Sequence, residues 1–595
     1  MPDPRHTGEW LAGCYVVSFE VDVMKSKVIF VVSMLVVSFA VVATAQTGAE
    51  DSPRPVIGRS MVVTGHGIVA ASQPLAARAG VQVLERGGNA IDAAIAANAT
   101  IGLMEPTGNG IGGDLFALIY EAETGELYGL NASGWAPSGR TVEFLRSKGF
   151  DEVPGRGIYS VTVPGVVAGW DMMRERFGSL PFSESLAPAI YYAENGFPVS
   201  PVISRGWARS SEMLAAHPNS KETFLPGGQA PKLGEMFRNP DLGASLRRIA
   251  EHGRDGYYKG QTAEAILKIS EEMGGTFTAD DLSEFRPQWV TPISTMYRGW
   301  KVSEIPPNTQ GIAALIMLNL MEQYPIGEYG FHSAKALHVA IEAKKLAYAD
   351  MLGYVGDPDF SQIPVEPMLS KAHAAERAKL IDPAQAACEV SPSYFPGITT
   401  AEGNDTIYMT TIDKDGNIVS LIQSNYSGFG SGLVPPGVGF MLHNRGALFT
   451  MEEGHANTVE PRKRPLHTII PAFMEKDGVQ IGFGIMGGWN QAQAHAQFVA
   501  NIVDFGFNIQ EALEAGRFTK GSFTGCDVNV ESLIPANVRT ELTALGHELS
   551  VRPPRTGGFG HGQAVMGTPE GIHFGASEPR HDGAAVPQAP SIFDR

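Results

Sequence analysis

Gly403-Asn-Asp-Thr-Ile-Tyr-Met-Thr-Thr-Ile-Asp-Lys-Asp-Gly416 places one threonine, Thr406, directly before a strand-like run. The run ends in a turn at 413–416, and a second strand-like run follows over 417–424. Inside a chain, a threonine hydroxyl is a poor nucleophile. If the peptide bond between Asp405 and Thr406 is cut, the freed α-amine can act as the base for this hydroxyl. Self-cleavage before Thr406, with this threonine as nucleophile, is therefore one hypothesis for the stretch.

The turn fixes an expected register for the two runs. If 406–412 pairs with 417–424 as a hairpin, residues whose numbers sum to about 829 or 830 face each other. Thr406 then lies opposite Gln423 or Ser424, and the Ser424 hydroxyl could orient the Thr406 hydroxyl. Considered alone, the pattern favours two ordinary strands of a half-buried sheet, because hydroxyl side chains are common in strands.

The composition is that of a large globular protein. The chain has 595 residues, with 43% hydrophobic and 18% charged residues, so a sizeable core is expected in one very large domain or several. The formal net charge is -18, which predicts an acidic surface and argues against nucleic acid as a partner.

The N-terminal region has the pattern of an export signal over 24–45. A basic start at 24–27 precedes an apolar run over 28–42 and the small residues Ala43-Thr-Ala45. The run is shorter than the roughly 20 residues of a membrane span. We therefore expect cleavage and export to the periplasm or the medium, with no stable membrane span afterwards; the alternative is an uncleaved anchor. Residues 1–23 are a doubtful extension that an upstream start codon would explain.

The cysteines do not form a metal-binding motif. Without residues 1–23, Cys14 is lost, and Cys388 and Cys526 remain. Whether these two pair is left open by the sequence.

The rest of the chain alternates between helical and strand-like patterns. The expected helices are 74–86, 89–104, 333–352, 491–503 and 509–515, and the expected strands include 115–120. Helices that flank two strand-rich regions suggest a layered α/β body.

The glycine loop Gly108-Asn-Gly-Ile-Gly-Gly113 matches a dinucleotide-binding spacing. That site needs a strand before the loop and a helix after it, whereas here a helix precedes the loop and a strand follows. We reject this interpretation in favour of a tight helix-to-strand connection. The histidines, such as His66, His467, His561 and His581, are scattered, and we predict neither a metal nor a cofactor.

A second glycine pair, Gly487-Gly488, follows an apolar strand and precedes a helix that starts near Asn490. Backbone N–H groups at a helix entrance can stabilise an oxyanion. The alternative is a turn that needs a positive φ.

Taken together, these segments resemble the γ-glutamyltransferase family of N-terminal nucleophile hydrolases over roughly 64–580. The motifs that carry the resemblance are 87–94, 105–106 with 110–113, 405–406 with 413–416, 463–466, 487–488 and 575–580. The resemblance implies an α/β (α+β) fold, a four-layer αββα sandwich. It also implies self-cleavage into a large subunit, 46–405, and a small catalytic subunit, 406–595.

The resemblance also implies roles for individual residues. Thr406 is the expected nucleophile, Ser424 replaces the family's helper threonine, and Gly487 and Gly488 hold the oxyanion. The residues that clamp the glutamyl group differ from the family pattern. Ser133 stands where an arginine is expected, Leu448 where an aspartate is expected, and His467 and Thr468 where two serines are expected. The lid segment between Phe449 and Pro461 also looks short.

The variant motifs 423–430 and Asn444-Arg445-Gly446 resemble the branch that contains oxamate amidohydrolase and glutathione hydrolase-like proteins. We therefore expect substrate contacts from Asn444, Arg445, His467 and Thr468. Our hypothesis is that Arg445 replaces the missing arginine as a carboxylate anchor. The alternative is a surface arginine.

The leading functional hypothesis is a self-processing amidohydrolase that cleaves γ-glutamyl or related amide bonds through an acyl-threonine, as in glutathione hydrolysis or γ-glutamyl transfer. Its expected partner is a small-molecule amide. One alternative is an acylase or oxamate-type amidohydrolase that does not act on glutathione. An exported binding protein without turnover is an alternative of a different class. The accepted acyl group, the balance between hydrolysis and transfer, and the oligomeric state are left open.

Overall fold

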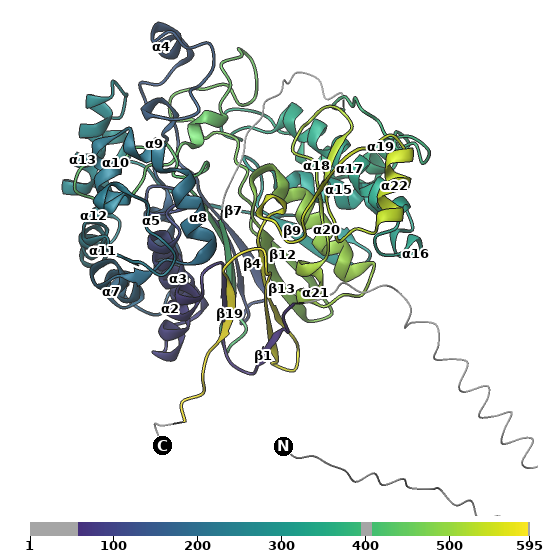
Figure 1. The fold of residues 1–595 in the computed structure, drawn as a ribbon, viewed down its shortest axis with the longest axis horizontal. Helices are drawn as coiled ribbons and strands as arrows, with labels where there is room; N and C mark the ends of the chain where they lie inside the picture. The colour runs from purple at the N-terminus through teal and green to yellow at the C-terminus, as the bar shows by residue number, and fades with distance from the viewer. Residues whose placement is uncertain (1–57, 394–406, 593–595) are drawn as a thin grey trace, which may run out of the picture. The chain divides into compact units, whose positions relative to one another are not determined.

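Within residues 58–393 and 407–592, which the computed structural model describes, two seven-stranded antiparallel sheets lie face to face (Figure 1). The first sheet has the order β1 (Val62–Thr64), β18 (His573–Ser577), β17 (Gly562–Gly567), β13 (Val479–Ile485), β12 (Ala472–Lys476), β9 (Trp300–Glu304) and β8 (Ile293–Tyr297). The second has the order β19 (Ala584–Pro587), β2 (Ile68–Ala71), β10 (Ile407–Ile412), β11 (Ile418–Ser424), β3 (Asp114–Glu121), β4 (Glu126–Ala132) and β7 (Gln288–Val290).

Strand β3 illustrates how the second sheet is buried on both faces. Successive side chains of a strand point to opposite faces, and here both sets are apolar. Phe116, Leu118 and Tyr120 pack in a core shared with β12 and β13. Leu115, Ala117 and Ile119 pack in a second core against the neighbouring helices. The sheet therefore lies between the other sheet and a layer of helices.

The helical layer on the second sheet includes α2 (Pro74–Glu85), α3 (Ala90–Met104) and α5 (Val166–Phe177). Helix α3 begins at a capping box in which Asn89 and Asp92 exchange side-chain and backbone hydrogen bonds. Helix α2 ends before Gly87, whose φ of 93° suits glycine. Both helices agree with the sequence-based prediction to within one residue at each end.

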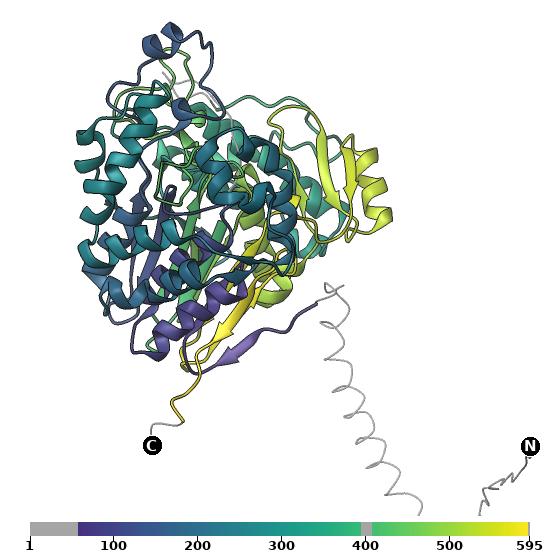
Figure 2. The same ribbon diagram turned by 60° about the vertical axis from the view of Figure 1, so that its left-hand side comes forward.

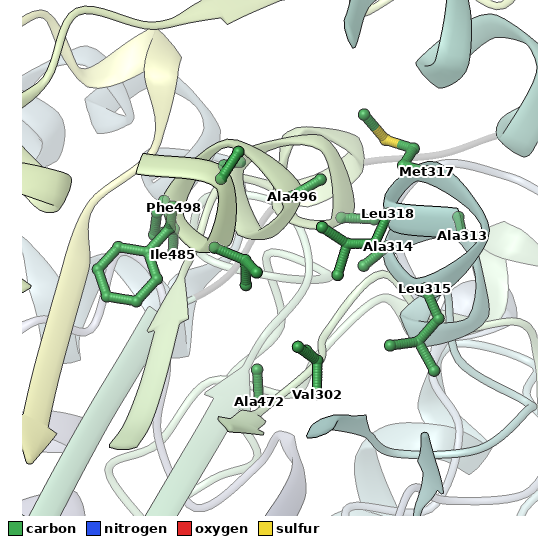
Figure 3. Close-up of a cluster of buried hydrophobic side chains, with 14 of the residues drawn as sticks. Val302, Ala313, Ala314, Leu315, Met317, Leu318, Ala472, Ile485, Ala496 and Phe498 are labelled. Carbon is green, nitrogen blue, oxygen red and sulfur yellow. The ribbon is translucent and has the colours of Figure 1, made fainter. Parts of the chain in front are cut away.

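The other outer layer consists of α15 (Gly311–Met321), α17 (Ala334–Tyr354) and α20 (Gln491–Val503). Figure 3 shows Leu318, Ala496 and Phe498 of this layer near Val302, Ala472 and Ile485 of the first sheet. Figure 2 shows the same layers from a second direction. The order helix, sheet, sheet, helix confirms the predicted α/β class and αββα sandwich.

The remaining helices and short strands lie around these layers. The helices are α4 (Val142–Ser147), α6 (Phe182–Ser185), α7 (Ala187–Asn195), α8 (Pro201–Arg209), α9 (Ser211–Ala215), α10 (Pro218–Phe224), α11 (Pro240–His252), α12 (Asp255–Tyr258), α13 (Gly260–Glu272), α14 (Ala279–Ser283), α16 (Ile326–Tyr329), α18 (Val365–Leu369), α19 (Lys371–Ala378), α21 (Ile509–Glu514) and α22 (Ala536–Ala544). The short strands are β5 (Phe197–Pro198), β6 (Met236–Phe237), β14 (Phe518–Thr519), β15 (Asp527–Glu531) and β16 (Glu548–Arg552). Among the described residues, no helix has the length and apolar character needed to cross a membrane.

Both sheets mix strands from the two sides of the predicted cleavage point. In the second sheet, β10 lies between β2, from the N-terminal side, and β11. In the first sheet, β12 pairs with β9, and β18 pairs with β1. The predicted subunits, 46–405 and 406–595, would therefore share both sheets.

A disulfide joins Cys388 to Cys526, which answers the question that the sequence left open. The two cysteines are 138 positions apart. Near the bond, the Gly525 N–H donates to the Cys388 carbonyl at 2.7 Å. The link connects the segment before position 406 to the segment after it. The predicted signal over 24–45 and the extension over 1–23 lie outside the described residues.

Candidate active site

The predicted hairpin is present with the predicted register. Ile407 pairs with Gln423 and Ile412 with Ile418, so paired residue numbers sum to 830. Asp405 and Thr406 lie outside the described residues, which begin again at Ile407. At the end of β11, Ser424 lies opposite Asp114 of β3. The Ser424 hydroxyl oxygen accepts a hydrogen bond from the Tyr426 N–H at 2.7 Å.

The glycine loop before β3 packs directly against the end of β11. A Cβ atom on Gly113 would lie 2.3 Å from the Ser424 carbonyl oxygen, and one on Gly112 would lie 2.1 Å from the Met441 carbonyl oxygen. The Asn425 N–H donates to the Gly108 carbonyl at 2.9 Å. These glycines therefore allow close backbone approach at the site, as expected of a tight connection and not of a dinucleotide loop.

The second glycine pair forms the turn between β13 and α20. Gly487 and Gly488 have φ values of 132° and 60°, and Gly488 begins a short 3₁₀ turn that leads into α20. The Gln310 side-chain amide donates to the Gly488 carbonyl at 2.7 Å and also to the Thr468 carbonyl. The Gln310 side chain therefore links the predicted oxyanion turn at Gly488 to Thr468, one of the predicted substrate-contact residues. The sequence-based prediction missed Gln310.

Five side chains form a buried charge cluster: Asp114, His443, Arg445, His467 and Thr468, each 0% exposed. Asp114 Oδ2 lies 3.0 Å from His443 Nδ1, 3.5 Å from Arg445 Nε and 3.6 Å from His467 Nε2. Arg445 Nη1 donates to Thr468 Oγ1 at 2.9 Å. Arg445 also lies over the Tyr426 ring, 4.6 Å from its centroid. The structure therefore brings together three of the four predicted substrate-contact residues.

The electrostatics of the cluster hold Asp114 in its charged form. Burial by itself would raise the pKa of this carboxyl, but its neighbours, His443 first and Arg445 also, lower it to about 2. The pKa of His467 is lowered well below its usual value, mainly by burial and also by Arg445. His467 is therefore a neutral member of the cluster near pH 7.

The other predicted positions have different surroundings. Asn444 donates to the Gly155 carbonyl at 2.6 Å and accepts from the Ser427 N–H at 3.0 Å, so its amide braces two loops. Leu448, which replaces the family's aspartate, is a core residue. The alternative in which Arg445 is a surface residue is wrong, because Arg445 is fully buried. Asp114 and His443 were missed by the sequence-based prediction, although Asp114 directly follows the glycine loop.

We expect Asp114→Asn to destabilise the protein strongly. Removing one partner of a buried ion pair leaves the other charge uncompensated, which costs about 3–5 kcal/mol. Because the pKa of Asp114 is lowered in the folded protein, ionised Asp114 adds to the free energy of unfolding. This contribution is complete above the ordinary aspartate pKa of about 3.9 and is lost as the pH falls through about 2. The difference from wild type in urea unfolding should therefore shrink as the pH falls from about 4 towards 2.

The matched control for Asp114→Asn is Glu453→Gln, which removes the carboxylate of the exposed Arg146–Glu453 pair. We expect a loss of at most about 1 kcal/mol there. Equal losses from the two substitutions would contradict a special role for the buried charge cluster.

A second group of potential ligands, His338, Glu342 and His547, has ligand atoms within 4.8 Å of one another. His338 Nδ1 and His547 Nε2 are hydrogen-bonded at 2.8 Å, and Lys345 donates to Glu342 at 2.6 Å. The group is thus a hydrogen-bonded network with an ammonium ion beside it. We propose no metal there.

Two facing antiparallel sheets between helical layers, with a threonine before a central strand, define the N-terminal nucleophile hydrolase class. The comparisons agree with this assignment. The family model for gamma-glutamyltranspeptidase matches residues 76–588. The chain belongs to the γ-glutamyltranspeptidase family, a family of hydrolases and transferases, as the sequence motifs suggested.

Three relatives give the range of activities named in the family. The chain is 37% identical over 539 residues to the glutathione hydrolase-like YwrD proenzyme of Bacillus subtilis (strain 168), covering 90% of this chain and 99% of the relative. It is 33% identical to the oxamate amidohydrolase proenzyme of Klebsiella pneumoniae, covering 88% and 99%. The crystal structure of cephalosporin acylase from Bacillus halodurans matches with a TM-score of 0.83 and 41% identity, covering 91% and 99%.

Proposed function

We propose that this chain is a precursor that cleaves itself between Asp405 and Thr406 and then hydrolyses amide bonds with Thr406. The observation that carries the proposal is a convergence of elements. The start of β10 lies beside the end of β11 at Ser424, and Ile407 of β10 lines the same cavity as Met486, the residue before the Gly487–Gly488 turn. The names of two relatives, both proenzymes, support self-processing. The proposed products are a large subunit, 46–405, and a small subunit, 406–595.

The proposed reaction has two steps. The Thr406 hydroxyl attacks the amide carbonyl while its own α-amine takes the proton, and the N–H groups of Gly487 and Gly488 stabilise the oxyanion. The C–N bond breaks, the amine half leaves with that proton, and the acyl group stays on the threonine oxygen. Water then attacks the ester, which releases a carboxylic acid and restores the hydroxyl. An acceptor amine in place of water would give transfer.

The site favours acyl groups that lack an α-ammonium. Leu448, at the position of the family's aspartate, lies in the core and offers no counter-charge for an ammonium. Ser133 replaces the family's arginine, and its hydroxyl donates a hydrogen bond to Asn131 Oδ1 at 2.6 Å. We propose Arg445 as the carboxylate anchor, with Thr468 and His467 beside it. Because Asp114 offsets part of the Arg445 charge, we expect small carboxylate-bearing acyl groups to be held less tightly than by an uncompensated arginine.

The acylase alternative is supported by the cephalosporin acylase match. It differs from the oxamate-type alternative in the size of the acyl group. Both alternatives use the same nucleophile and the same oxyanion turn. Measuring which substrates are hydrolysed distinguishes the acylase from the oxamate-type enzyme.

The test is a substrate panel with the purified, processed protein. The panel contains γ-glutamyl amides, including glutathione, together with oxamate and N-acyl lactams. We expect turnover of at least one member, with a higher kcat/KM for an acyl group without the ammonium than for its γ-glutamyl counterpart. A chain that stays in one piece and hydrolyses none of them would favour an exported binding protein.

Arg445→Ala should raise KM for a carboxylate-bearing acyl group by on the order of tenfold or more, because one charge-assisted hydrogen-bonding partner is lost. Arg445→Lys, which keeps the charge but not the planar fork, should give an intermediate value. Steady-state kinetics of the two variants provide the measurement. An unchanged KM in Arg445→Ala would contradict the anchor.

We also propose export to the periplasm or the medium. The signal pattern over 24–45 supports this location. The Cys388–Cys526 disulfide supports it independently, because such bonds persist in oxidising compartments.

A further inference from the structure

A cavity of about 610 Å³ lies beside the candidate catalytic elements. Ile407, the first residue of β10, and Met486, the residue before Gly487, both line it. On the N-terminal side it is lined by α8 and by Glu105. On the C-terminal side it is lined by the segment 555–557 with His561 and by Arg580 with His581. The cavity therefore adjoins both the start of the nucleophile's strand and the oxyanion turn.

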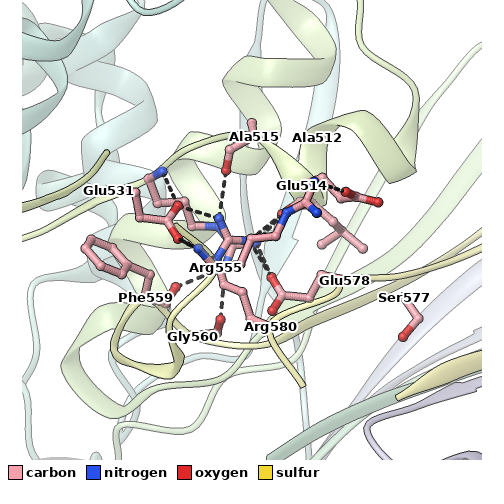
Figure 4. Close-up of polar contacts among 12 residues, drawn as sticks. Ala512, Glu514, Ala515, Glu531, Arg555, Phe559, Gly560, Ser577, Glu578 and Arg580 are labelled. Carbon is pink, nitrogen blue, oxygen red and sulfur yellow. Dashed lines mark hydrogen bonds and ion pairs between the residues drawn. The ribbon is translucent and has the colours of Figure 1, made fainter. Parts of the chain in front are cut away.

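Four arginines line the cavity, and only two of them form ion pairs with carboxylates in the described part of the chain. Arg580 is bonded to Glu531 at 2.5 Å and to Glu578 at 2.9 Å (Figure 4). Arg555 is bonded to Glu514 at 2.7 Å (Figure 4). These ion pairs neutralise the arginines and brace the cavity wall.

Arg205 and Arg209 have no such carboxylate. They lie four residues apart on α8, so both project from one face of the helix. Both side chains are exposed, and within 58–393 and 407–592 neither guanidinium makes a hydrogen bond or an ion pair. Two uncompensated guanidinium groups at a cavity wall attract a carboxylate.

Glu105 and His561, which line the cavity, have buried polar atoms. Glu105 is 1% exposed; its Oε2 accepts from the Ser72 hydroxyl at 3.1 Å, and its Oε1 lies 3.7 Å from Nδ1 of His581, which also lines the cavity. Both ring nitrogens of His561 are buried and have no hydrogen-bond partner among the described residues. Because these atoms have almost no accessible surface, Glu105 and His561 shape the cavity wall, and the exposed side chains of Arg205 and Arg209 are available to a ligand.

The two arginines, in a cavity that adjoins the start of β10 and the oxyanion turn, fit a molecule with its amide at one end and a carboxylate at the other. The amine half of an N-acyl amino acid or peptide has this combination. We propose that this cavity binds the amine half of the amide substrate, with Arg205 and Arg209 holding its carboxylate. The inference rests on the proposed function, and it identifies the substrates as amides whose amine half carries a free carboxylate.

The test compares two substrates that differ only in this carboxylate: an N-acylglycine and the matching N-acylglycinamide, with the acyl group that the panel shows to be best. For wild type, we expect KM for the glycinamide to exceed KM for the acylglycine on the order of tenfold. The preference should weaken as salt is added, because exposed charges are screened. In the double variant Arg205→Gln/Arg209→Gln, the ratio should fall to near one.

The matched control is Arg238→Gln, an exposed arginine that does not line this cavity. It should keep the wild-type ratio. If wild type turns over both substrates with a ratio near one, or if the double variant keeps the preference, this inference fails while the proposed function stands. If processed wild type hydrolyses neither the panel nor these two compounds, the proposed function fails and this inference fails with it.

Discussion

Thr406→Ala is expected to give a chain that stays in one piece and hydrolyses no amide. The substitution removes the hydroxyl that performs both self-cleavage and substrate attack under the proposed mechanism. Loss of a catalytic nucleophile lowers rates by several orders of magnitude, at least about 10⁴-fold. Denaturing gels with reductant follow the cleavage, and amide hydrolysis by the purified protein follows the turnover.

Thr406→Ser is the informative companion to Thr406→Ala, because it keeps a hydroxyl and an α-amine after cleavage. We expect it to be processed and to retain measurable hydrolysis. Splitting of the Thr406→Ala chain at the same position would contradict the assignment and place the nucleophile elsewhere. An intact alanine variant beside a processed serine variant would link the hydroxyl to the cleavage itself.

The second large effect concerns the Cys388–Cys526 disulfide. The cysteines lie on opposite sides of position 406, so the bond would hold the two proposed subunits together covalently after cleavage. Without reductant, the processed protein should run on a denaturing gel as one species. With reductant, the same sample should separate into two.

Cys388→Ser should give two bands without reductant, while the native protein should still elute as one particle, because strands of both subunits share both sheets. Free thiols should be blocked with an alkylating reagent at lysis, so that pairing is not created or lost during handling. Two bands from blocked wild type without reductant would contradict a native disulfide between the subunits.

The local features of this fold were accessible from the sequence, whereas the long-range ones were not. The β10–β11 register followed from the Asp413–Gly416 turn and from the period of two along a strand. Helix α3 followed from its apolar run after Gly87-Gly88, and the structure adds Asn89 as its cap. These features depend on neighbours in the chain.

The buried charge cluster depends instead on residues far apart in the chain. The cluster forms because three segments converge: β3 with Asp114, the segment after β11 with His443, and the segment before β12 with His467. Local sequence patterns do not indicate which distant segments meet. The arginine was singled out by family comparison, but its burial and its aspartate partner required the structure. The pairing of Cys388 with Cys526 was undetermined for the same reason.

The shared sheets have a consequence for how the processed protein recovers from unfolding. Before cleavage, refolding involves one chain, and its rate does not depend on concentration. After cleavage and reduction, the halves must first meet, because each lacks strands of both sheets, so recovery becomes second order and slows on dilution. With the cross-link intact, the halves remain tethered and the reaction returns to first order. One covalent bond would thus allow a two-chain protein to refold as though it were one.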